Sequence, residues 1–455
     1  MWIANPWVAG DTPYVLDGTN AFLDCLSQHV YSACGYTGKL NYAGLMSPVG
    51  DWPLLQHVPD LISWELGAHV HATRTRILEL LSVLAVTGSI ALAWITLSRV
   101  GQRRWFWGFV FVVLSSPLLW YARTTAAEAL ATGWLVCLVA ATVLQAPGPV
   151  IALAAIGACW TKETSYPFVA LLGVLGLMLA QRRTGRPIRA DLLWGTAGMV
   201  IGITLASLFN EVRYGKVINP NFYESQLHTN GTGRQLEYAA GVLVSPSGGM
   251  FVFWPAASVL VLTACLLPVV RRRRLYGRPA LILAFVIAGL TFGFASWWTP
   301  FGWGGYGPRL FLPWGLPLVL LVLVAYGEPL ARVVRRVLRP VWGLVLVFVI
   351  GFAFTLPHIG HMWHPHNTDA FFDQPHPRCQ SPWLGGEAAW NKCQHEQMWF
   401  DRPMPLYALD GLGDPGAVAT MVLVGAAMLG CLILLRDVPR DVVAEEVERQ
   451  RTETE

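Results

Sequence analysis

Two aspartates near the N-terminus have the chemistry of a general base. Asp11 lies in the segment from Gly10 to Tyr14, and Asp17 follows six residues later. A carboxylate beside a membrane surface can take the proton of an attacking hydroxyl group. The alternative is a loop aspartate that caps a helix or a turn, and the spacing alone favours this alternative.

Arg123 and Glu128 place two opposite charges at the start of an otherwise apolar stretch. Ionisable groups at the end of a membrane span are costly, and for that reason they often mark functional sites. The alternative is that Arg123 snorkels toward water and that Glu128 stabilises a helix N-terminus.

Lys162 and Glu163 are adjacent residues between two short apolar segments. A lysine on the outer side of a membrane does not contribute to the positive-inside pattern, and its ammonium group suits a phosphate. The alternative is a neutralised ion pair in a short turn.

A glycine-rich segment leads directly into an apolar stretch at Arg309. Residues 302–307 contain four glycines together with Trp303 and Tyr306. Glycine lets the backbone approach a ligand closely, and an arginine can fork onto a phosphate. The glycines favour a binding segment over the alternative, an aromatic belt with a snorkelling arginine.

Histidines and known cofactor motifs do not indicate a metal or a nucleotide. A run of histidines begins at His358 and continues through His361, His364 and His366, but Pro365 breaks its register. No cysteine or carboxylate completes a metal site there, so we interpret the run as a loop. Because no phosphate-binding loop or dinucleotide motif is present, we expect no cofactor; a divalent metal is not indicated.

Two pairs of cysteines lie in predicted outer loops, where disulfides form readily. We predict that Cys25 pairs with Cys34 and that Cys379 pairs with Cys393; free thiols are the alternative. The other four cysteines lie in apolar stretches.

The elements that position these residues are transmembrane helices. Of the 455 residues, 54% are hydrophobic and 13% are charged, against roughly 25% charged residues in a soluble domain. This composition excludes a typical cytosolic enzyme and a disordered chain, and the net charge of +4 does not indicate a nucleic-acid partner.

Apolar stretches of about the length of a membrane span lie at 77–98, 105–121, 125–144, 148–161, 166–181, 191–210, 249–270, 279–297, 310–327, 340–357 and 416–435. We therefore expect an all-α polytopic membrane protein with about eleven spans, or twelve if an N-terminal helix is missing. The stretches 148–161 and 166–181 could instead form one re-entrant hairpin.

The arginines orient the predicted helices. If residues 1–76 lie outside, 20 of the 32 cationic residues fall in the short cytoplasmic segments, which is a strong positive-inside pattern. The chain then divides into an outer first loop (1–76), a transmembrane core (77–357), an outer loop (358–415), a last span (416–435) and a charged cytoplasmic tail (436–455).

Four segments, in this order, resemble one known family. They are Gly10 to Leu16, Ser116 to Glu128, Asn210 to Pro255, and Gly302 to Pro313. Together they are similar to the polytopic, polyprenyl-phosphate-sugar-dependent glycosyltransferases of the C superfamily, which include protein mannosyltransferases and aminoarabinose transferases. The likeness covers most of residues 8–320. Thr12 stands where the family has a glutamate, so a two-carboxylate mechanism is not supported.

This resemblance implies a role for each candidate residue. Asp11 is expected to be the general base, with Glu128 orienting the acceptor or the base. Arg309, Lys162 and Arg123 are expected to bind the donor phosphate. The substrate-binding residues would then be Asp17, Glu163, Trp303 and Tyr306. The implied partners are a polyprenyl-phosphate sugar, membrane lipids, and an extracytoplasmic glycan, lipid or protein acceptor.

A transporter or flippase for a lipid-linked or sugar substrate is the second hypothesis, because it also needs many spans and cationic residues. Transporters usually contain internal repeats, and none is visible in this chain. A scaffold subunit that has lost catalysis is a third. The arginine-rich, lysine-poor composition is typical of a high-GC bacterium and predicts a multi-pass protein of its plasma membrane, with an extracytoplasmic active site.

Overall fold

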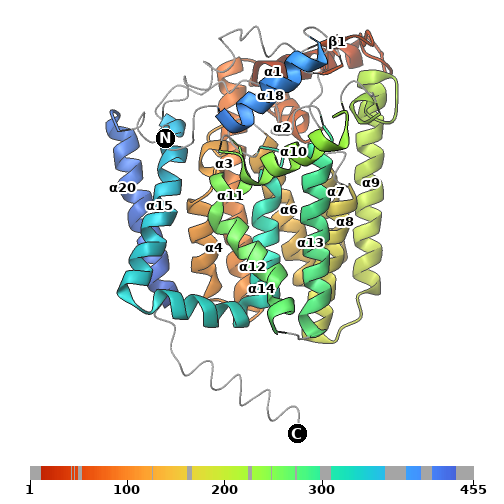
Figure 1. The fold of residues 1–455 in the computed structure, drawn as a ribbon. Helices are drawn as coiled ribbons and strands as arrows, with labels where there is room; N and C mark the ends of the chain where they lie inside the picture. The colour runs from red at the N-terminus through yellow and green to blue at the C-terminus, as the bar shows by residue number, and fades with distance from the viewer. Residues whose placement is uncertain are drawn as a thin grey trace.

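Each of the eleven apolar stretches coincides with a helix or with a broken pair of helices. The computed structural model describes residues 12–41, 44–45, 47–49, 54–124, 127–160, 166–223, 228–246, 248–271, 274–297, 309–363, 386–400 and 412–436. In this part of the chain the long helices run roughly parallel, and short helices cover one end of the bundle (Figure 1).

Eleven helices form the bundle, counting only the described residues. They are α3 (His71–Arg99), α4 (Trp105–Leu114), α6 (Ala127–Val143), α7 (Gly148–Cys159), α8 (Tyr166–Thr184), α9 (Arg189–Tyr214), α12 (Pro255–Arg271), α13 (Arg274–Ala295), α14 (Leu312–Leu338), α15 (Val341–Trp363) and α20 (Pro415–Arg436). Four further helices cover one end: α1 (Thr12–Ser27), α2 (Leu54–Glu65), α10 (Thr232–Val244) and α18 (Glu387–Phe400). We call these the cap helices and their side of the bundle the cap end.

The remaining elements are short. They are the single turns α5 (Leu118–Tyr121), α11 (Met250–Phe253) and η2 (Pro220–Phe222), and the strands β1 (Leu40–Asn41) and β2 (Gly44–Leu45). The two strands pair antiparallel, with Leu40 opposite Leu45. A two-residue ladder does not change the all-α class.

Among the described residues, six helices are long and apolar enough to cross a membrane: α3, α9, α13, α14, α15 and α20. The expected all-α polytopic membrane protein is thereby confirmed. Of the other predicted spans, α4, α6, α7 and α12 contain shorter apolar helices, and α8 has 19 residues. The stretch 105–121 breaks near Pro117 and the stretch 249–270 breaks before Pro255, since proline has no N–H for the helical hydrogen bond and fits best in the first turn of a helix.

Helix α7 has 12 residues and is therefore about 18 Å long, well short of the roughly 30 Å hydrocarbon layer. It packs closely on α9 through small residues. A Cβ on Gly198 would lie 2.3 Å from the carbonyl oxygen of Ala152, and a Cβ on Gly202 would lie 3.0 Å from the Cβ of Cys159. Such small-residue contacts hold helices together where lipid supplies no hydrophobic driving force.

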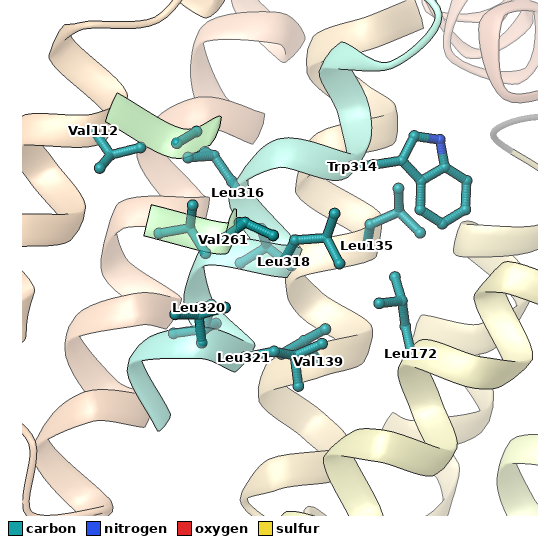
Figure 2. Close-up of a cluster of buried hydrophobic side chains, with 14 of the residues drawn as sticks. Val112, Leu135, Val139, Leu172, Val261, Trp314, Leu316, Leu318, Leu320 and Leu321 are labelled. Carbon is teal, nitrogen blue, oxygen red and sulfur yellow. The ribbon is translucent and has the colours of Figure 1, made fainter. Parts of the chain in front are cut away.

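Helix α14 forms the centre of the bundle. Its leucines and valines from Leu316 to Leu323 are all buried. Figure 2 shows Leu318, Leu320 and Leu321 of this helix among side chains from α4, α6, α8 and α12. Since α6 also packs against α14, the starts of these two helices have fixed relative positions.

The arginine-bearing helix ends lie away from the cap helices. The connections from α8 to α9 and from α14 to α15 are both at the far end of the bundle (Figure 1). These helix ends carry Arg182, Arg189 and Arg335.

Candidate active site

Glu128 and Arg309 form an ion pair at the cap-end termini of two central helices. Glu128 lies in the first turn of α6, where the helix dipole stabilises a carboxylate. Arg309 precedes the start of α14. Its Nε donates to Glu128 Oε1 at 2.6 Å. The two side chains are only 3% and 13% exposed, so the pair is largely shielded from water.

The second oxygen of Glu128 is left open. Within the described part of the chain, Glu128 Oε2 is buried and accepts no hydrogen bond. A buried polar atom without a partner is destabilising, and such atoms are few in folded proteins. The pair thus combines a cation fixed by Glu128 Oε1 with a carboxylate oxygen that no described residue bonds.

Arg123 makes its contacts elsewhere, with residues at the end of α15. Its Nη1 donates to the carbonyl oxygen of Met362 at 2.7 Å, and its guanidinium lies 5.5 Å from the centre of the Trp363 ring. Burial lowers the pKa of Arg123, whereas the carboxylates of Glu79 and Asp414 raise it. Arg123 therefore connects the outer end of α15 with the start of α20, and its expected binding of a donor phosphate stays a prediction.

Helix α1 begins at Thr12, immediately after Asp11, and a buried arginine fixes it to the bundle. Arg74 of α3 donates through Nε to Asp60 Oδ1 of α2 at 2.7 Å and through Nη2 to Asp60 Oδ2. It also donates to Asn20 Oδ1 and to the carbonyl oxygen of Leu16 on α1. Arg74 and Asp60 are fully buried. We call this set the Arg74 clamp; it holds α1, α2 and α3 together.

His57 is a buried residue that nothing in the local sequence singles out. The Thr19 hydroxyl donates to the carbonyl oxygen of Val15 at 2.9 Å and lies 3.0 Å from His57 Nδ1. If the single hydrogen of that hydroxyl stays on the carbonyl oxygen of Val15, Nδ1–H donates to Thr19 and Nε2 is the bare nitrogen. Nε2 is buried without a partner among the described residues. Burial, together with the nearby Arg213, lowers the pKa of His57 to about 3.

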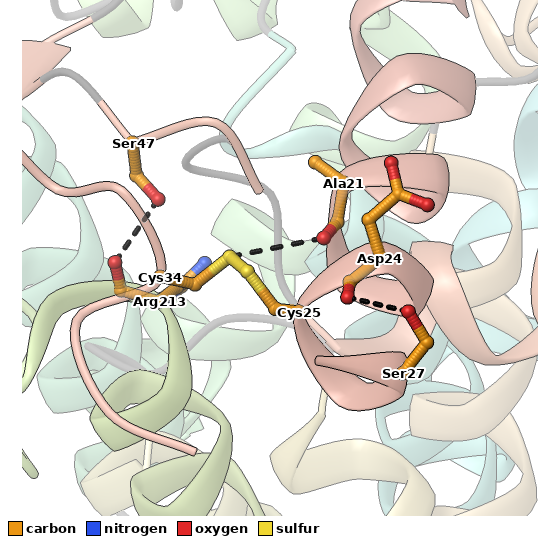
Figure 3. Close-up of a disulfide and its surroundings, with 7 residues drawn as sticks. All are labelled: Ala21, Asp24, Cys25, Ser27, Cys34, Ser47 and Arg213. Atoms are coloured by element: carbon orange, nitrogen blue, oxygen red, sulfur yellow. Dashed lines mark hydrogen bonds between the residues drawn. A yellow bond between two sulfur atoms is a disulfide. The ribbon is translucent and has the colours of Figure 1, made fainter. Parts of the chain in front are cut away.

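The loop after α1 is held to the end of α9. Cys25 and Cys34 form a disulfide with their Cα atoms 6.0 Å apart (Figure 3). The backbone N–H groups of Ala33 and Cys34 donate to the carbonyl oxygens of Glu211 and Val212. The Ser47 hydroxyl donates to the carbonyl oxygen of Arg213 at 3.0 Å. These bonds connect the first predicted outer loop to a membrane-crossing helix.

The structure places several other candidates individually. Asp17 is an exposed residue of α1. Cys393 is disulfide-bonded, but Cys379 lies outside the described residues, so that pairing stays a prediction. Also outside are Asp11, Lys162, Glu163, Trp303 and Tyr306. The start of the histidine run is not a loop, because His358 and His361 lie in the last turns of α15. His358 is buried and donates from Nε2 to the carbonyl oxygen of Phe253 at 2.8 Å. Among the described residues no cluster of metal-ligating side chains is present.

Two residues of the segment from Asn210 to Pro255, which carries part of the family resemblance, have packing roles in the structure. Asn210 Oδ1 accepts hydrogen bonds from Nε and Nη2 of Arg213, at 2.8 and 2.6 Å. The Ser245 hydroxyl donates to the carbonyl oxygen of Met398 on α18 at 2.6 Å. These bonds of Asn210 stay within α9, whereas the bond of Ser245 helps to fix the cap helix α18, a role that the sequence alone did not indicate.

No family model and no curated protein matches the sequence. Two solved structures resemble the chain: ArnT from Cupriavidus metallidurans in the apo state, and the same protein bound to undecaprenyl phosphate. Their sequence identities to this chain are 15% and 16%, with TM-scores of 0.43 and 0.44. The alignments cover 95% and 93% of this chain and 74% of each ArnT chain. We transfer no residue role from them.

Proposed function

We propose that this multi-pass membrane protein is a glycosyltransferase that moves a sugar from a polyprenyl-phosphate donor to an extracytoplasmic acceptor. The acceptor would be a hydroxyl group of a glycan, a lipid or a protein. The observation that carries the proposal is the buried Glu128–Arg309 pair at the cap end of the bundle.

Arg309 has the properties needed to hold the donor phosphate. A guanidinium carries five N–H groups, so it can donate to Glu128 and to a phosphate at the same time. The contact to Glu128 fixes the plane of the guanidinium, and its position before α14 is set by the buried centre of the bundle. Lys162 and Arg123 are further predicted cations for the same phosphate.

Asp11 supplies the proposed general base. The acceptor O–H gives its proton to the Asp11 carboxylate while its oxygen attacks the anomeric carbon of the donor sugar. The bond from that carbon to the phosphate oxygen breaks, and polyprenyl phosphate leaves with the electron pair. Arg309 stabilises the charge that develops on the leaving phosphate. Asp17, Glu163, Trp303 and Tyr306 are proposed to bind the sugar and the acceptor.

The cap end is proposed to be the extracytoplasmic side of a bacterial plasma membrane. The arginine-bearing ends of α8, α9 and α14 lie at the opposite end of the bundle. By the positive-inside rule that end faces the cytoplasm. Cys25 lies on the cap helix α1, so its disulfide with Cys34 is on the cap side, which fits an oxidising compartment.

The first experiment measures sugar transfer by the purified full chain in detergent, with a panel of synthetic polyprenyl-phosphate sugars. We expect transfer by the wild type and a loss of roughly 10²–10⁴-fold in rate for Asp11→Asn, because the variant cannot accept the proton. Asp24→Asn is the matched control, since Asp24 is an exposed carboxylate of α1. Its rate should equal that of the wild type.

The same preparation discriminates between the two classes of function. Wild-type turnover in Asp11→Asn would remove Asp11 from the mechanism. No transfer of any sugar, with passage of the lipid-linked substrate across liposomes containing the protein, would move the chain to the transporter class.

A further inference from the structure

The open oxygen of Glu128 is not used by the mechanism above. Glu128 is 2% exposed, and its Oε1 is occupied by Arg309. Its Oε2 is buried and lacks a hydrogen-bond partner in the part of the chain that the structure describes. An unprotonated carboxylate oxygen accepts hydrogen bonds and donates none. The missing partner must therefore be an O–H or N–H group.

We propose that Glu128 Oε2 binds the polar hydrogen of the donor sugar's substituent on the carbon next to the anomeric carbon. This inference rests on the proposed function, in which Arg309 holds the donor phosphate. The two oxygens of one carboxylate lie side by side, with Arg309 on one of them. The substituent next to the anomeric carbon is likewise the sugar group closest to the phosphate. A donor with its phosphate on Arg309 thus presents that group to Oε2.

Glu128 then has two functions in one side chain. Through Oε1 it is a positioning residue for Arg309, and through Oε2 it distinguishes sugars. A hydroxyl group or the N–H of an acylated amine would satisfy Oε2, whereas a 2-deoxy sugar would leave it buried and unpaired. Sites that hydrogen-bond a substrate group reject the analogue that lacks it, because the polar atom of the protein is then left without a partner.

The buried carboxylate at the other end of the bundle provides a contrast. Asp191 of α9 is 5% exposed, and its Oδ2 accepts a hydrogen bond from Gln145 Nε2 at 3.1 Å. Gln145 in turn accepts from the Thr184 hydroxyl at 3.0 Å. That carboxylate has a protein partner for its structural role. Asp191→Asn therefore serves as the matched control for the loss of a buried carboxylate.

The test measures kcat/KM for a pair of donors, one with the parent sugar and one with its 2-deoxy analogue. We expect the wild type to lose about 100-fold on the 2-deoxy donor, since hydrogen bonds to charged groups are worth about this factor. Glu128→Gln keeps an oxygen that can accept from Arg309, but replaces the charged acceptor by an amide. It should be slower on the parent donor, and its 2-deoxy loss should fall below about tenfold.

The two donors differ in intrinsic reactivity, but this difference is the same for the wild type and for every variant. It therefore cancels when their kcat/KM ratios for the two donors are compared. Asp191→Asn should keep the wild-type ratio of the two donors. If Glu128→Gln does not accumulate, Glu128→Asp provides the second variant; it retains the charge but withdraws the oxygen, so its 2-deoxy loss should also shrink.

The outcomes distinguish a failure of the proposed function from a failure of the proposed role of Glu128 Oε2. No transfer of any donor by the wild type overturns the proposed function. Transfer with the same 2-deoxy loss in the wild type and both Glu128 variants overturns only the role of Oε2. A loss that depends on Glu128 but appears with 3-deoxy or 4-deoxy donors instead would overturn the assigned sugar position.

Discussion

Two buried arginine–carboxylate pairs in this protein are built in opposite ways. In the Arg74 clamp both oxygens of Asp60 accept from the guanidinium, and Asn20 and Leu16 accept from the same arginine. In the Glu128–Arg309 pair one carboxylate oxygen is bonded and the other, within the described residues, is open. The first pair is completed by the protein, whereas the second, on our proposal, is completed by a bound ligand. Burial of a charge thus does not by itself indicate function; the state of its hydrogen-bonding atoms does.

The largest expected effect comes from breaking the completed pair. Arg74→Met leaves the Asp60 carboxylate fully buried without its cation, and loss of one partner of a buried pair costs about 3–5 kcal/mol. We expect a sharp fall in thermal stability in detergent and in the yield of monodisperse protein. Glu128→Gln should melt close to the wild type, because the amide oxygen of that variant can still accept from Arg309.

The double variant Asp60→Leu/Arg74→Met is the control for this prediction. Replacing both members of a buried ion pair by apolar residues is often neutral or stabilising, so the double variant should regain much of the lost stability. If Arg74→Met melts no lower than Glu128→Gln, the distinction between a structural and a functional pair does not hold.

Substitution of Arg309 tests the proposed function of the Glu128–Arg309 pair. Arg309→Ala removes the cation proposed to bind the donor phosphate, and Arg309→Lys retains a charge without the planar fork. We expect the KM for the donor to rise about tenfold for lysine, and further for alanine, because a charged hydrogen bond contributes roughly 1.5–3 kcal/mol. Donor titrations in the transfer assay measure both values.

Each alternative result for Arg309 has a definite meaning. Lysine as effective as arginine would show that only the charge is needed. A normal donor KM in Arg309→Ala would place the phosphate elsewhere, with Lys162 as the next residue to substitute.

The sequence predicted the fold better than it predicted the site. The apolar stretches located the helices, because the length of a span follows directly from the thickness of the bilayer. Arg309 and Glu128 were selected individually from their places at span ends. Their contact was not predicted, since they are 181 residues apart in sequence and only the packing of α6 on α14 brings them together. Arg123 was grouped with them, but the structure places it against Met362 and Trp363.

The contacts among the polar residues of α1, α2 and the start of α3 could not be predicted from the sequence either. Nothing in the spacing of Asp60, Arg74 and Asn20 indicates that they meet, because α1, α2 and α3 contribute one residue each. His57 is a lone histidine in a helix with a proline inside it. Its ring packs on Phe209 of α9, and Arg213 of the same helix acts on it through its charge, which lowers the pKa of His57. Long-range contacts of this kind are set by tertiary packing and leave no local pattern.

His57 is a third buried group with a polar atom that no described residue bonds, and its substitution has the smallest expected effect. Its Nε2 is buried without a partner in the described residues, but Arg213 opposes a positive charge there, and the pKa of His57 is lowered to about 3. An unfolded histidine titrates near 6.5. Between these values the unfolded chain binds a proton that the folded protein does not, so stability must fall as the pH drops below about 6.5. The expected loss is about 1.4 kcal/mol for each pH unit.

His57→Gln should flatten this acid dependence of the melting temperature, whereas His29→Gln, at an exposed histidine, should leave it unchanged. A wild-type melting temperature that is constant from about pH 6.5 to pH 4.5, or one with the same slope in His57→Gln, would contradict this assignment. The nitrogen would then have to be satisfied by a bound partner, as we propose for Glu128.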